Sequence, residues 1–346
     1  MSAKYLEKSH IETCHFSAST LLAEQAIMCL ELVSELVKSG LDFQFKGGNS
    51  LLLILDTPKR FSIDVDIATD CKRDEIEMSL DLCVDKFGVF KCWKPRQHKT
   101  KPWIPLASYY LYYKSGFTDD ESSVMLDVQL RRSNYRTSRK SVVCGDIYKS
   151  DALVELPLPS SIIGDKLLTL GPSTLGIPVG KGKEAQRLKH VFDISRLLTM
   201  EPKLSDIRES FTNCLQQENE IQVTKQSADA VIDDTLKFCG SIVSYPQIPS
   251  GDTLSPIVEE NAKGIIPFAS HLFDSGYNWK MLQTDMAKVA LCMTALKDTA
   301  ITDTIFAEML GMNAAKKPLP GVTLNENSTA RELWEQIYAV SGSLPF

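Results

Sequence analysis

The chain has 346 residues, of which 43% are hydrophobic and 24% are charged. These proportions are typical of soluble globular proteins and exclude wholesale disorder. The length allows two domains, and no apolar run approaches the roughly 20 residues that a membrane-spanning helix needs. Because the polar residues 1–15 lack the apolar core of a secretory signal, we expect a cytoplasmic protein that is not associated with membranes.

The formal net charge of -6 argues against a protein that coats nucleic acid without specificity. Three local basic clusters could nevertheless hold a phosphate-rich ligand. They are Lys91, Lys94, Arg96, Lys99 and Lys101; Arg131, Arg132, Arg136, Arg139 and Lys140; and Lys181, Lys183, Arg187 and Lys189. For any one cluster taken alone, a solvated loop is the better explanation.

The 9 cysteines are scattered along the chain and include no Cys-x-x-Cys pair, which argues against a structural zinc site. Several lie in apolar contexts, such as Cys29 and Cys292. We interpret them as reduced thiols that are mostly small core side chains.

The N-terminal half mixes helical and strand patterns. Residues 17–38 carry apolar side chains at helical spacing, with Ser17 or Ser19 as the N-cap and Gly40 as the stop. The pattern then predicts a strand over 42–45, a helix over 49–55, a strand over 61–68, a helix over 74–90, a basic loop or edge over 91–105, strands over 107–114 and 124–130, a polar connection over 131–140 and an irregular stretch over 142–159.

From Ser160 onward the pattern is mostly helical. The predicted helices cover 160–170, 184–199, 203–217, 224–241, 281–297, 301–311 and 329–341. Residues 171–182 and 245–267 are rich in glycine or proline and are predicted to be loops. The sequence thus predicts two domains, residues 1–158 with strands and helices and residues 159–346 with helices alone.

Two aspartates share one face of the strand predicted over 61–68. Because strand side chains alternate, Asp64 and Asp66 project together, and Val65 and Ile67 project to the other side. Carboxylates this close repel each other unless a cation lies between them, and Mg²⁺ prefers such oxygen ligands. For a bare Asp-x-Asp pattern, a solvated strand face is the simpler explanation.

A third carboxylate lies in the strand predicted over 124–130, where Asp127 is the only charged residue. If this strand lies beside the first one, Asp127 joins Asp64 and Asp66 in a three-carboxylate site. Such sites bind metal ions that stabilise both sides of a phosphoryl displacement. Asp127 could also act as general base toward an attacking hydroxyl.

The turn at 46–50 separates a predicted strand from a predicted helix. Gly47 and Gly48 would let a ligand approach the backbone closely, and the N–H groups at a helix start attract phosphate. Asn49 or Ser50 could add a side-chain donor. An ordinary turn capped by Asn49 explains these residues when they are taken alone. The Asp-x-Asp pattern that follows at this spacing makes a nucleotide site the stronger interpretation.

The run FKGGNSLLLILDTPKRFSIDVDIA, residues 45–68, resembles the first motif of the nucleotidyltransferase AbiEii/AbiGii toxin family. These polymerase-β-like nucleotidyltransferases are toxins of type IV toxin–antitoxin and abortive-infection systems, and some add nucleotides to tRNA. The resemblance implies an α+β fold with a mixed sheet flanked by helices, followed by an all-helical domain. It further implies nucleotide binding by Gly47, Gly48, Asn49 and Ser50, and Mg²⁺ or Mn²⁺ binding by Asp64, Asp66 and Asp127. Asn49 replaces the family's usual Thr or Ser.

Residues 162–170 resemble the lysine motif of the same family. On a helical wheel Lys166 falls within the apolar arc of Ile162, Ile163 and Leu167, which is unusual for a lysine. A triphosphate would be a fitting partner. A lysine that extends to solvent, or one that pairs with a local carboxylate, is the alternative.

Residues 187–194 resemble the family's Arg/Lys-Asp-x-Tyr-Asp-Leu motif, with Asp193 at the second aspartate. His190 stands at the first aspartate and Phe192 at the tyrosine. The resemblance implies that Asp193 orients the triphosphate or the metal site. Because Asp193 shares a helix face with Lys189, a surface ion pair explains it almost as well.

Together these features predict a metal-dependent nucleotidyltransferase that transfers NMP from an NTP to an acceptor hydroxyl. The expected acceptor is a tRNA 3′ end, and the expected protein partner is an antitoxin. One alternative keeps the enzyme but gives it a protein or small-molecule acceptor. The other is a non-catalytic binding module, which only the departures at Asn49 and His190 support. The clustered carboxylates argue against that module.

Overall fold

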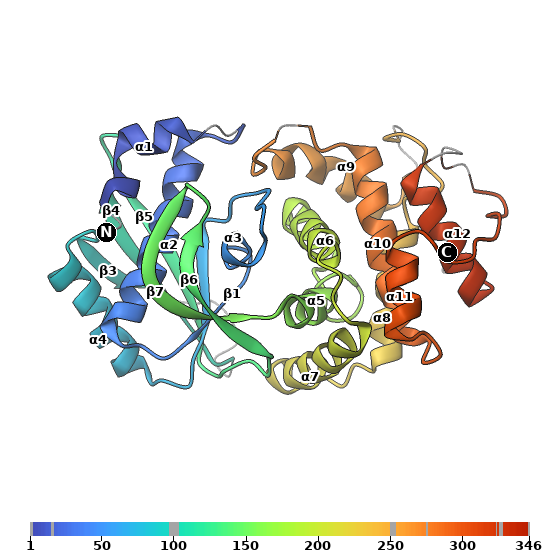
Figure 1. Cartoon of the computed structure of the whole chain (residues 1–346), viewed down its shortest axis with the longest axis horizontal. Coiled ribbons are helices and arrows are strands. Elements are labelled where there is room, and N and C mark those ends of the chain that lie inside the picture. Colours follow the sequence, from blue (N-terminus) through green and yellow to red (C-terminus); the bar gives the residue numbers. More distant parts are fainter. Residues whose placement is uncertain are drawn as a thin grey trace. The chain divides into compact units, whose positions relative to one another are not determined.

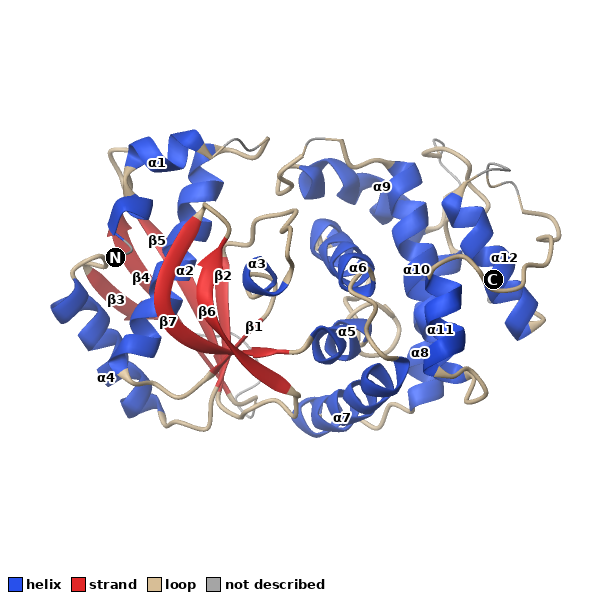
Figure 2. Cartoon of the chain, viewed as in Figure 1, coloured by secondary structure: helices blue, strands red, loops and turns tan. Residues whose placement is uncertain are grey.

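The computed structural model describes residues 3–14, 17–96, 104–249, 254–274, 276–322, 324 and 328–344. The chain divides into two compact units: Met1–Leu158 with Ser270–Ser275, and Pro159–Ala269 with Gly276–Phe346. Figure 1 labels the elements along the chain, and Figure 2 shows that the strands belong to the first unit while helices build the second. The predicted α+β class is therefore confirmed.

A seven-stranded mixed sheet forms the first unit. Its strands are β1 Gln44–Lys46, β2 Asp64–Ala68, β3 Cys92–Pro95, β4 Leu106–Lys114, β5 Glu121–Gln129, β6 Thr137–Cys144 and β7 Tyr148–Pro157. Their spatial order is β3-β4-β5-β2-β1-β7-β6. β2 runs parallel to β5, and β1 runs parallel to β7, while the other neighbours are antiparallel. The strand that carries Asp127 is thus a direct neighbour of the strand that carries Asp64 and Asp66.

Helix α2 (Thr20–Ser39) packs on one face of this sheet and buries its core (Figure 2). Ser19 caps the helix by accepting the Leu22 N–H at 3.3 Å, and Gly40 ends it with φ +89°. The other helices of this unit are the 3-10 turn Ala3–Leu6, α1 Lys8–Thr13, α3 Leu51–Ile54 and α4 Arg73–Leu82. The start and the stop predicted for the first long helix are both confirmed.

Two helices of the first unit are shorter than predicted. Helix α3 has a single turn, and α4 gives way to a π-helical turn over Cys83–Phe87. β2 begins later than predicted, because Phe61 donates its N–H to the His271 carbonyl at 2.9 Å. The residues before β2 therefore pair with a segment more than 200 positions away, which no local pattern could indicate.

The irregular stretch predicted over 142–159 is wrong, because these residues form the end of β6 and all of β7. β7 alternates buried and exposed side chains, with Tyr148 and Val154 at most 1% exposed. The polar members of this alternation concealed the pattern. The predicted connection over 131–140 is likewise a strand from Thr137 onward, whereas Lys99 and Lys101 lie outside the described residues.

Eight helices form the described part of the second unit. They are α5 Pro159–Leu167, α6 Glu184–Leu198, α7 Leu204–Gln222, α8 Ala228–Gly240, α9 Pro256–Ala269, α10 Trp279–Lys297, α11 Asp303–Leu310 and α12 Thr329–Ser341. The loop predicted over 245–267 is wrong in its second half, where α9 forms. Pro256 is the first residue of α9, where a missing N–H costs no hydrogen bond. No described helix combines the length and the apolar character needed to cross a membrane.

The cysteines are free thiols, as predicted. Six of them are buried, namely Cys29, Cys83, Cys144, Cys214, Cys239 and Cys292. Burial raises the pKa of the Cys144 thiol to about 12, so this thiol stays protonated and packs as a small apolar group.

Helix α2 also buries an acidic side chain, Glu35, which is 1% exposed. Burial and the nearby Glu31 carboxylate raise the pKa of Glu35 to about 8, although Lys38 and the Cys83 thiol act in the opposite direction. The folded chain therefore holds a proton on Glu35 at pH values where the unfolded chain has released it. Between the unfolded pKa near 4.5 and the folded pKa near 8, rising pH must destabilise the fold.

We expect Glu35→Gln to remove this pH dependence, because the amide is neutral throughout. Wild-type stability should fall by about 1.4 kcal/mol per pH unit in that window. The variant's advantage in free energy of unfolding should therefore grow by about 2–3 kcal/mol between roughly pH 5.5 and 7.5 in urea titrations. Asp119→Asn, at an exposed position, is the control and should change the slope little. Equal slopes for Glu35→Gln and wild type would contradict a buried protonated acid.

Candidate active site

Four side chains on neighbouring strands form a row across the sheet. Ser108 of β4 stands opposite Asp127 of β5, and Asp127 stands opposite Asp66 of β2. Asp66 in turn stands opposite Lys46 of β1. Neighbouring strands lie about 4.7–4.9 Å apart, so residues that stand opposite each other are close. Strand register alone therefore brings two carboxylates, a hydroxyl and an ammonium group together.

This row lines a pocket of about 260 Å³. The polar part of its lining is Lys46, Asp66, Ser108, Asp127 and Gln129. The Ser108 hydroxyl donates to Asp127 Oδ1, and Lys46 Nζ donates to Gln129 Oε1 at 2.9 Å. Ser108, Lys46 and Gln129 are site residues that the sequence did not indicate, because their positions depend on strand pairing. The pocket offers oxygen donors beside one positive charge.

Asp64 lies on the same face of β2 as Asp66, as the alternation predicted. Both are half-buried, while Val65 between them is fully buried. The partner of Asp64 on β5 is Met125, and the residues that line the pocket do not include Asp64. In the part of the chain that the structure describes, no three His, Cys, Asp or Glu side chains are grouped to hold a metal ion. The structure thus unites Asp66 with Asp127, and the three-carboxylate metal site stays a prediction.

Gly47 leaves the space that the Asp66 carboxylate occupies. Its φ is +73°, a left-handed conformation that glycine adopts without strain. A Cβ atom built on Gly47 would lie 1.9 Å from Asp66 Oδ2. The Ser50 hydroxyl closes the turn by donating to the Gly47 carbonyl at 2.9 Å. The turn is therefore shaped around the Asp66 carboxylate, and any side chain at position 47 would displace it.

Gly48 leaves similar space for a positive charge. A Cβ atom built on Gly48 would lie 2.7 Å from Nη2 of Arg60 and 2.9 Å from the Ser62 hydroxyl oxygen. Arg60 is 7% exposed and donates to the Phe61 carbonyl at 3.0 Å. The motif contains Arg60, but only the structure shows that its guanidinium lies against the glycine turn.

Asn49 and Ser50 are both 0% exposed. The Ser50 hydroxyl bonds within the turn. Among the described residues the amide atoms of Asn49 have no hydrogen-bond partner, and the side chain lies beside the Cys29 thiol of α2. Burial raises the pKa of that thiol, and the Asp64 and Asp66 carboxylates raise it further. Both turn side chains thus pack inward, and nucleotide binding by Asn49 and Ser50 stays a prediction.

Lys166 and Asp193 form a buried ion pair within the second unit. Lys166 Nζ of α5 lies 2.9 Å from Asp193 Oδ2 of α6, and the two residues are 7% and 1% exposed. The surface position considered for Asp193 is therefore wrong. His190 Nδ1 lies 2.5 Å from the Thr169 hydroxyl oxygen, which gives the histidine of this motif a local partner. The roles of Lys166 and Asp193 toward a nucleotide stay predictions.

Comparison with known proteins adds a family and two structures. The family model described as "Nucleotidyl transferase AbiEii toxin, Type IV TA system" matches residues 32–260. No curated protein matches the sequence. JHP933 from Helicobacter pylori is similar at 13% identity and a TM-score of 0.44, covering 81% of this chain and 93% of that one. An antigenic nucleotidyltransferase-like protein from Paracoccidioides brasiliensis is 13% identical with a TM-score of 0.37, covering 60% of this chain and 96% of that one.

Proposed function

Since the chain belongs to the nucleotidyl transferase AbiEii toxin family of type IV toxin–antitoxin systems and is a nucleotidyltransferase, we propose that it transfers NMP from an NTP to a tRNA 3′ end. The observation that carries this proposal is the register pairing of Asp66 with Asp127 in one pocket beside the Gly47 turn. The family also implies an antitoxin, which we propose as the protein partner. Toxicity during phage infection is the proposed biological role.

The donor set fits a hard divalent cation. Carboxylate oxygens are the ligands that Mg²⁺ prefers, and Mn²⁺ accepts them as well. Asp66 and Asp127 share a pocket, and the Gly47 turn leaves the Asp66 carboxylate room that a Cβ atom would fill. We propose that Asp64, Asp66 and Asp127 hold the ion. When bound, it would neutralise charge on the phosphate oxygens.

The reaction that we propose is an in-line displacement. The acceptor hydroxyl oxygen forms a new bond to the α-phosphorus of the NTP, and the bond from that phosphorus to the departing pyrophosphate breaks. Asp127 accepts the hydroxyl proton, while the Ser108 hydroxyl holds its Oδ1 in a fixed orientation. Positioning and charge neutralisation would supply most of the rate enhancement.

The size of the pocket limits what it receives. Its volume of about 260 Å³ is below the roughly 300–1,000 Å³ of sites that enclose a whole drug-sized ligand. We propose that it receives the reacting phosphate, with Gly47, Gly48, Asn49 and Ser50 at the phosphate-binding turn. Arg60, against Gly48, supplies positive charge there. Lys166 remains our proposed triphosphate ligand, and Asp193 orients its ammonium group at 2.9 Å.

A transfer assay tests the acceptor. The protein is incubated with Mg²⁺, one labelled NTP at a time and total tRNA, and the products are separated by size. We expect label at the tRNA 3′ end, and none when EDTA is present or when periodate has destroyed the terminal diol of the tRNA. Label on protein or on a small molecule instead would favour the alternative acceptors. An absence of transfer with every NTP would overturn the proposal.

A further inference from the structure

Residues 131–136 connect β5 to β6 without regular secondary structure, yet they are held in place. At the start of this segment, Gln129 Nε2 donates to the Arg131 carbonyl at 3.0 Å. In its middle, the Ser133 N–H donates to Gln44 Oε1 at 2.9 Å. The segment is therefore tied to β5 and to β1, the strands on either side of β2.

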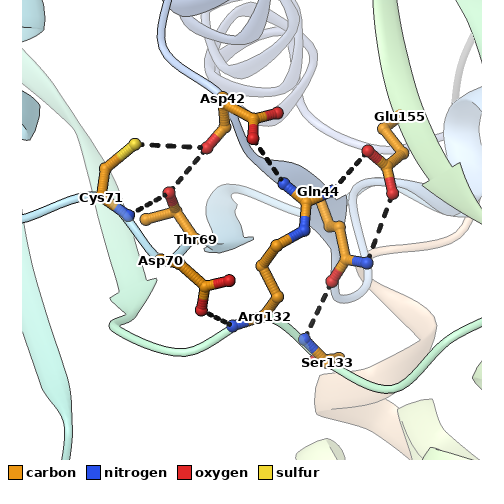
Figure 3. Close-up of polar contacts among 8 residues, drawn as sticks. All are labelled: Asp42, Gln44, Thr69, Asp70, Cys71, Arg132, Ser133 and Glu155. Atoms are coloured by element: carbon orange, nitrogen blue, oxygen red, sulfur yellow. Dashed lines mark hydrogen bonds and ion pairs between the residues drawn. The ribbon is translucent and has the colours of Figure 1, made fainter.

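Arg132 is the main anchor of this segment (Figure 3). Its guanidinium lies 3.1 Å from Asp42 Oδ2 and 2.5 Å from Glu155 Oε2. The backbone N–H of Arg132 donates to Asp70 Oδ1 at 2.9 Å. Burial opposes the ionised form of Glu155, but hydrogen bonds, above all from Arg132, outweigh burial and lower the pKa of that carboxyl. Arg132 thus belongs to the protein's own framework and not to the predicted ligand-binding cluster.

The anchored segment meets the candidate active site at Lys46. Lys46 Nζ lies 3.5 Å from the Ser133 hydroxyl oxygen and 5.5 Å from the centre of the Tyr135 ring. The same Lys46 lines the pocket that contains Asp66 and Asp127. The segment therefore lies at the border of the pocket, in direct contact with one of its walls.

The outward side chains of the segment have the chemistry of a nucleic-acid contact. Arg131, Asn134 and Arg136 are exposed, and Tyr135 is half-buried. Arginine recognises phosphate through paired hydrogen bonds, and tyrosine stacks on unpaired bases. A fixed segment with exposed arginines on both sides of an aromatic ring suits an extended single strand better than a folded protein surface.

We propose that residues 131–136 form a preset cradle for the single-stranded 3′ end of an RNA acceptor. Arg131 and Arg136 contact its phosphates, and Tyr135 stacks on a base, so that the terminal hydroxyl reaches Asp127. The anchoring by Arg132 keeps the cradle in its binding conformation before RNA arrives, which lowers the entropic cost of binding. This inference rests on the proposed function and identifies the part of the first unit that would hold the acceptor.

The double variant Tyr135→Ala/Arg136→Glu tests the cradle. Binding to a labelled hairpin RNA with a single-stranded 3′ overhang is followed by fluorescence anisotropy, independently of catalysis. We expect binding to weaken at least about tenfold and kcat/KM for RNA to fall by a similar factor. A blunt hairpin should bind more weakly than the overhang and be affected less. NTP affinity, measured by calorimetry with Mg²⁺ and a non-hydrolysable NTP, should stay unchanged.

Lys86→Glu is the matched control, because it makes the same charge change at an exposed position of the first unit, in the π-helical turn that contacts α2 and α4. It should leave RNA binding within about twofold, given salt screening of distant charges. If the double variant binds and labels RNA as wild type does, the cradle is overturned while the proposed function stands. If wild type binds no RNA, the cradle and the tRNA assignment both fall.

Discussion

Asp66→Asn is expected to reduce nucleotide transfer by about 10²–10³-fold, because removing one group that stabilises charge in a transition state commonly costs that much. Asp66 occupies the centre of the row across the sheet, between Asp127 and Lys46. The substitution keeps the size and the hydrogen-bonding shape of the side chain but removes its charge. The measurement is the single-turnover rate of label transfer at saturating Mg²⁺ and NTP.

Two further variants test whether the loss of transfer is specific to the carboxylates of the pocket. Asp119→Asn removes a carboxylate from an exposed loop of the same unit and should transfer at the wild-type rate. Asp127→Asn should lose as much activity as Asp66→Asn, because the two carboxylates share one pocket. A transfer rate for Asp66→Asn within tenfold of wild type, with its fold intact by circular dichroism, would remove Asp66 from the catalytic machinery.

The local sequence pattern was sufficient to predict the positions of some of these site residues. The alternation of a strand places Asp64 and Asp66 on one face whatever their neighbours are, and burial in the structure follows that alternation. Asp127 needed one further assumption, that its strand lies beside β2, and the register bears this out. Ser108 needed knowledge of a third strand, β4, and nothing within its own stretch of sequence identified its partner.

The same distinction between local patterns and long-range pairing explains the errors in the predicted fold. Strand β7 was missed because polar residues such as Lys149 and Asp151 stand at its exposed positions and resemble a loop. Helix α9 was missed because Pro256 and Pro267 lie in it, one at its first residue and one in its last turn. Pairing of Phe61 with His271 depends on chain folding over a long separation. Amphipathic helices such as α2 were predictable because their pattern and their caps are local.

The Lys166–Asp193 pair shows a limit of the helical wheel. The wheel placed Lys166 on an apolar arc and Asp193 away from one, so only the lysine seemed buried. In the structure both are buried, because the Asp193 carboxylate of α6 forms an ion pair with the Lys166 ammonium group of α5. A buried pair of this kind is costly to break, since removing one partner leaves the other charge uncompensated. Fold and proposed activity therefore depend on the same two residues.

Gly47→Ala should impair catalysis far more than stability, and it is the second large effect we expect. The substitution adds strain at φ +73°, on the order of 1–2 kcal/mol. It also places a Cβ atom 1.9 Å from the observed position of Asp66 Oδ2, so the carboxylate must move. Because a displacement of about 1 Å in a catalytic group can cost about 100-fold, the transfer rate should fall by about two orders of magnitude.

Gly88→Ala separates the two causes. Gly88 has φ +75°, close to that of Gly47, but a Cβ atom there would meet nothing within 4 Å. Its alanine variant should show the same loss in free energy of unfolding, about 1–2 kcal/mol by urea titration, with an unchanged transfer rate. If Gly88→Ala slowed transfer as much as Gly47→Ala does, backbone strain would explain both results. Slow transfer in Gly47→Ala alone would instead mean that the turn acts by leaving the Asp66 carboxylate its place.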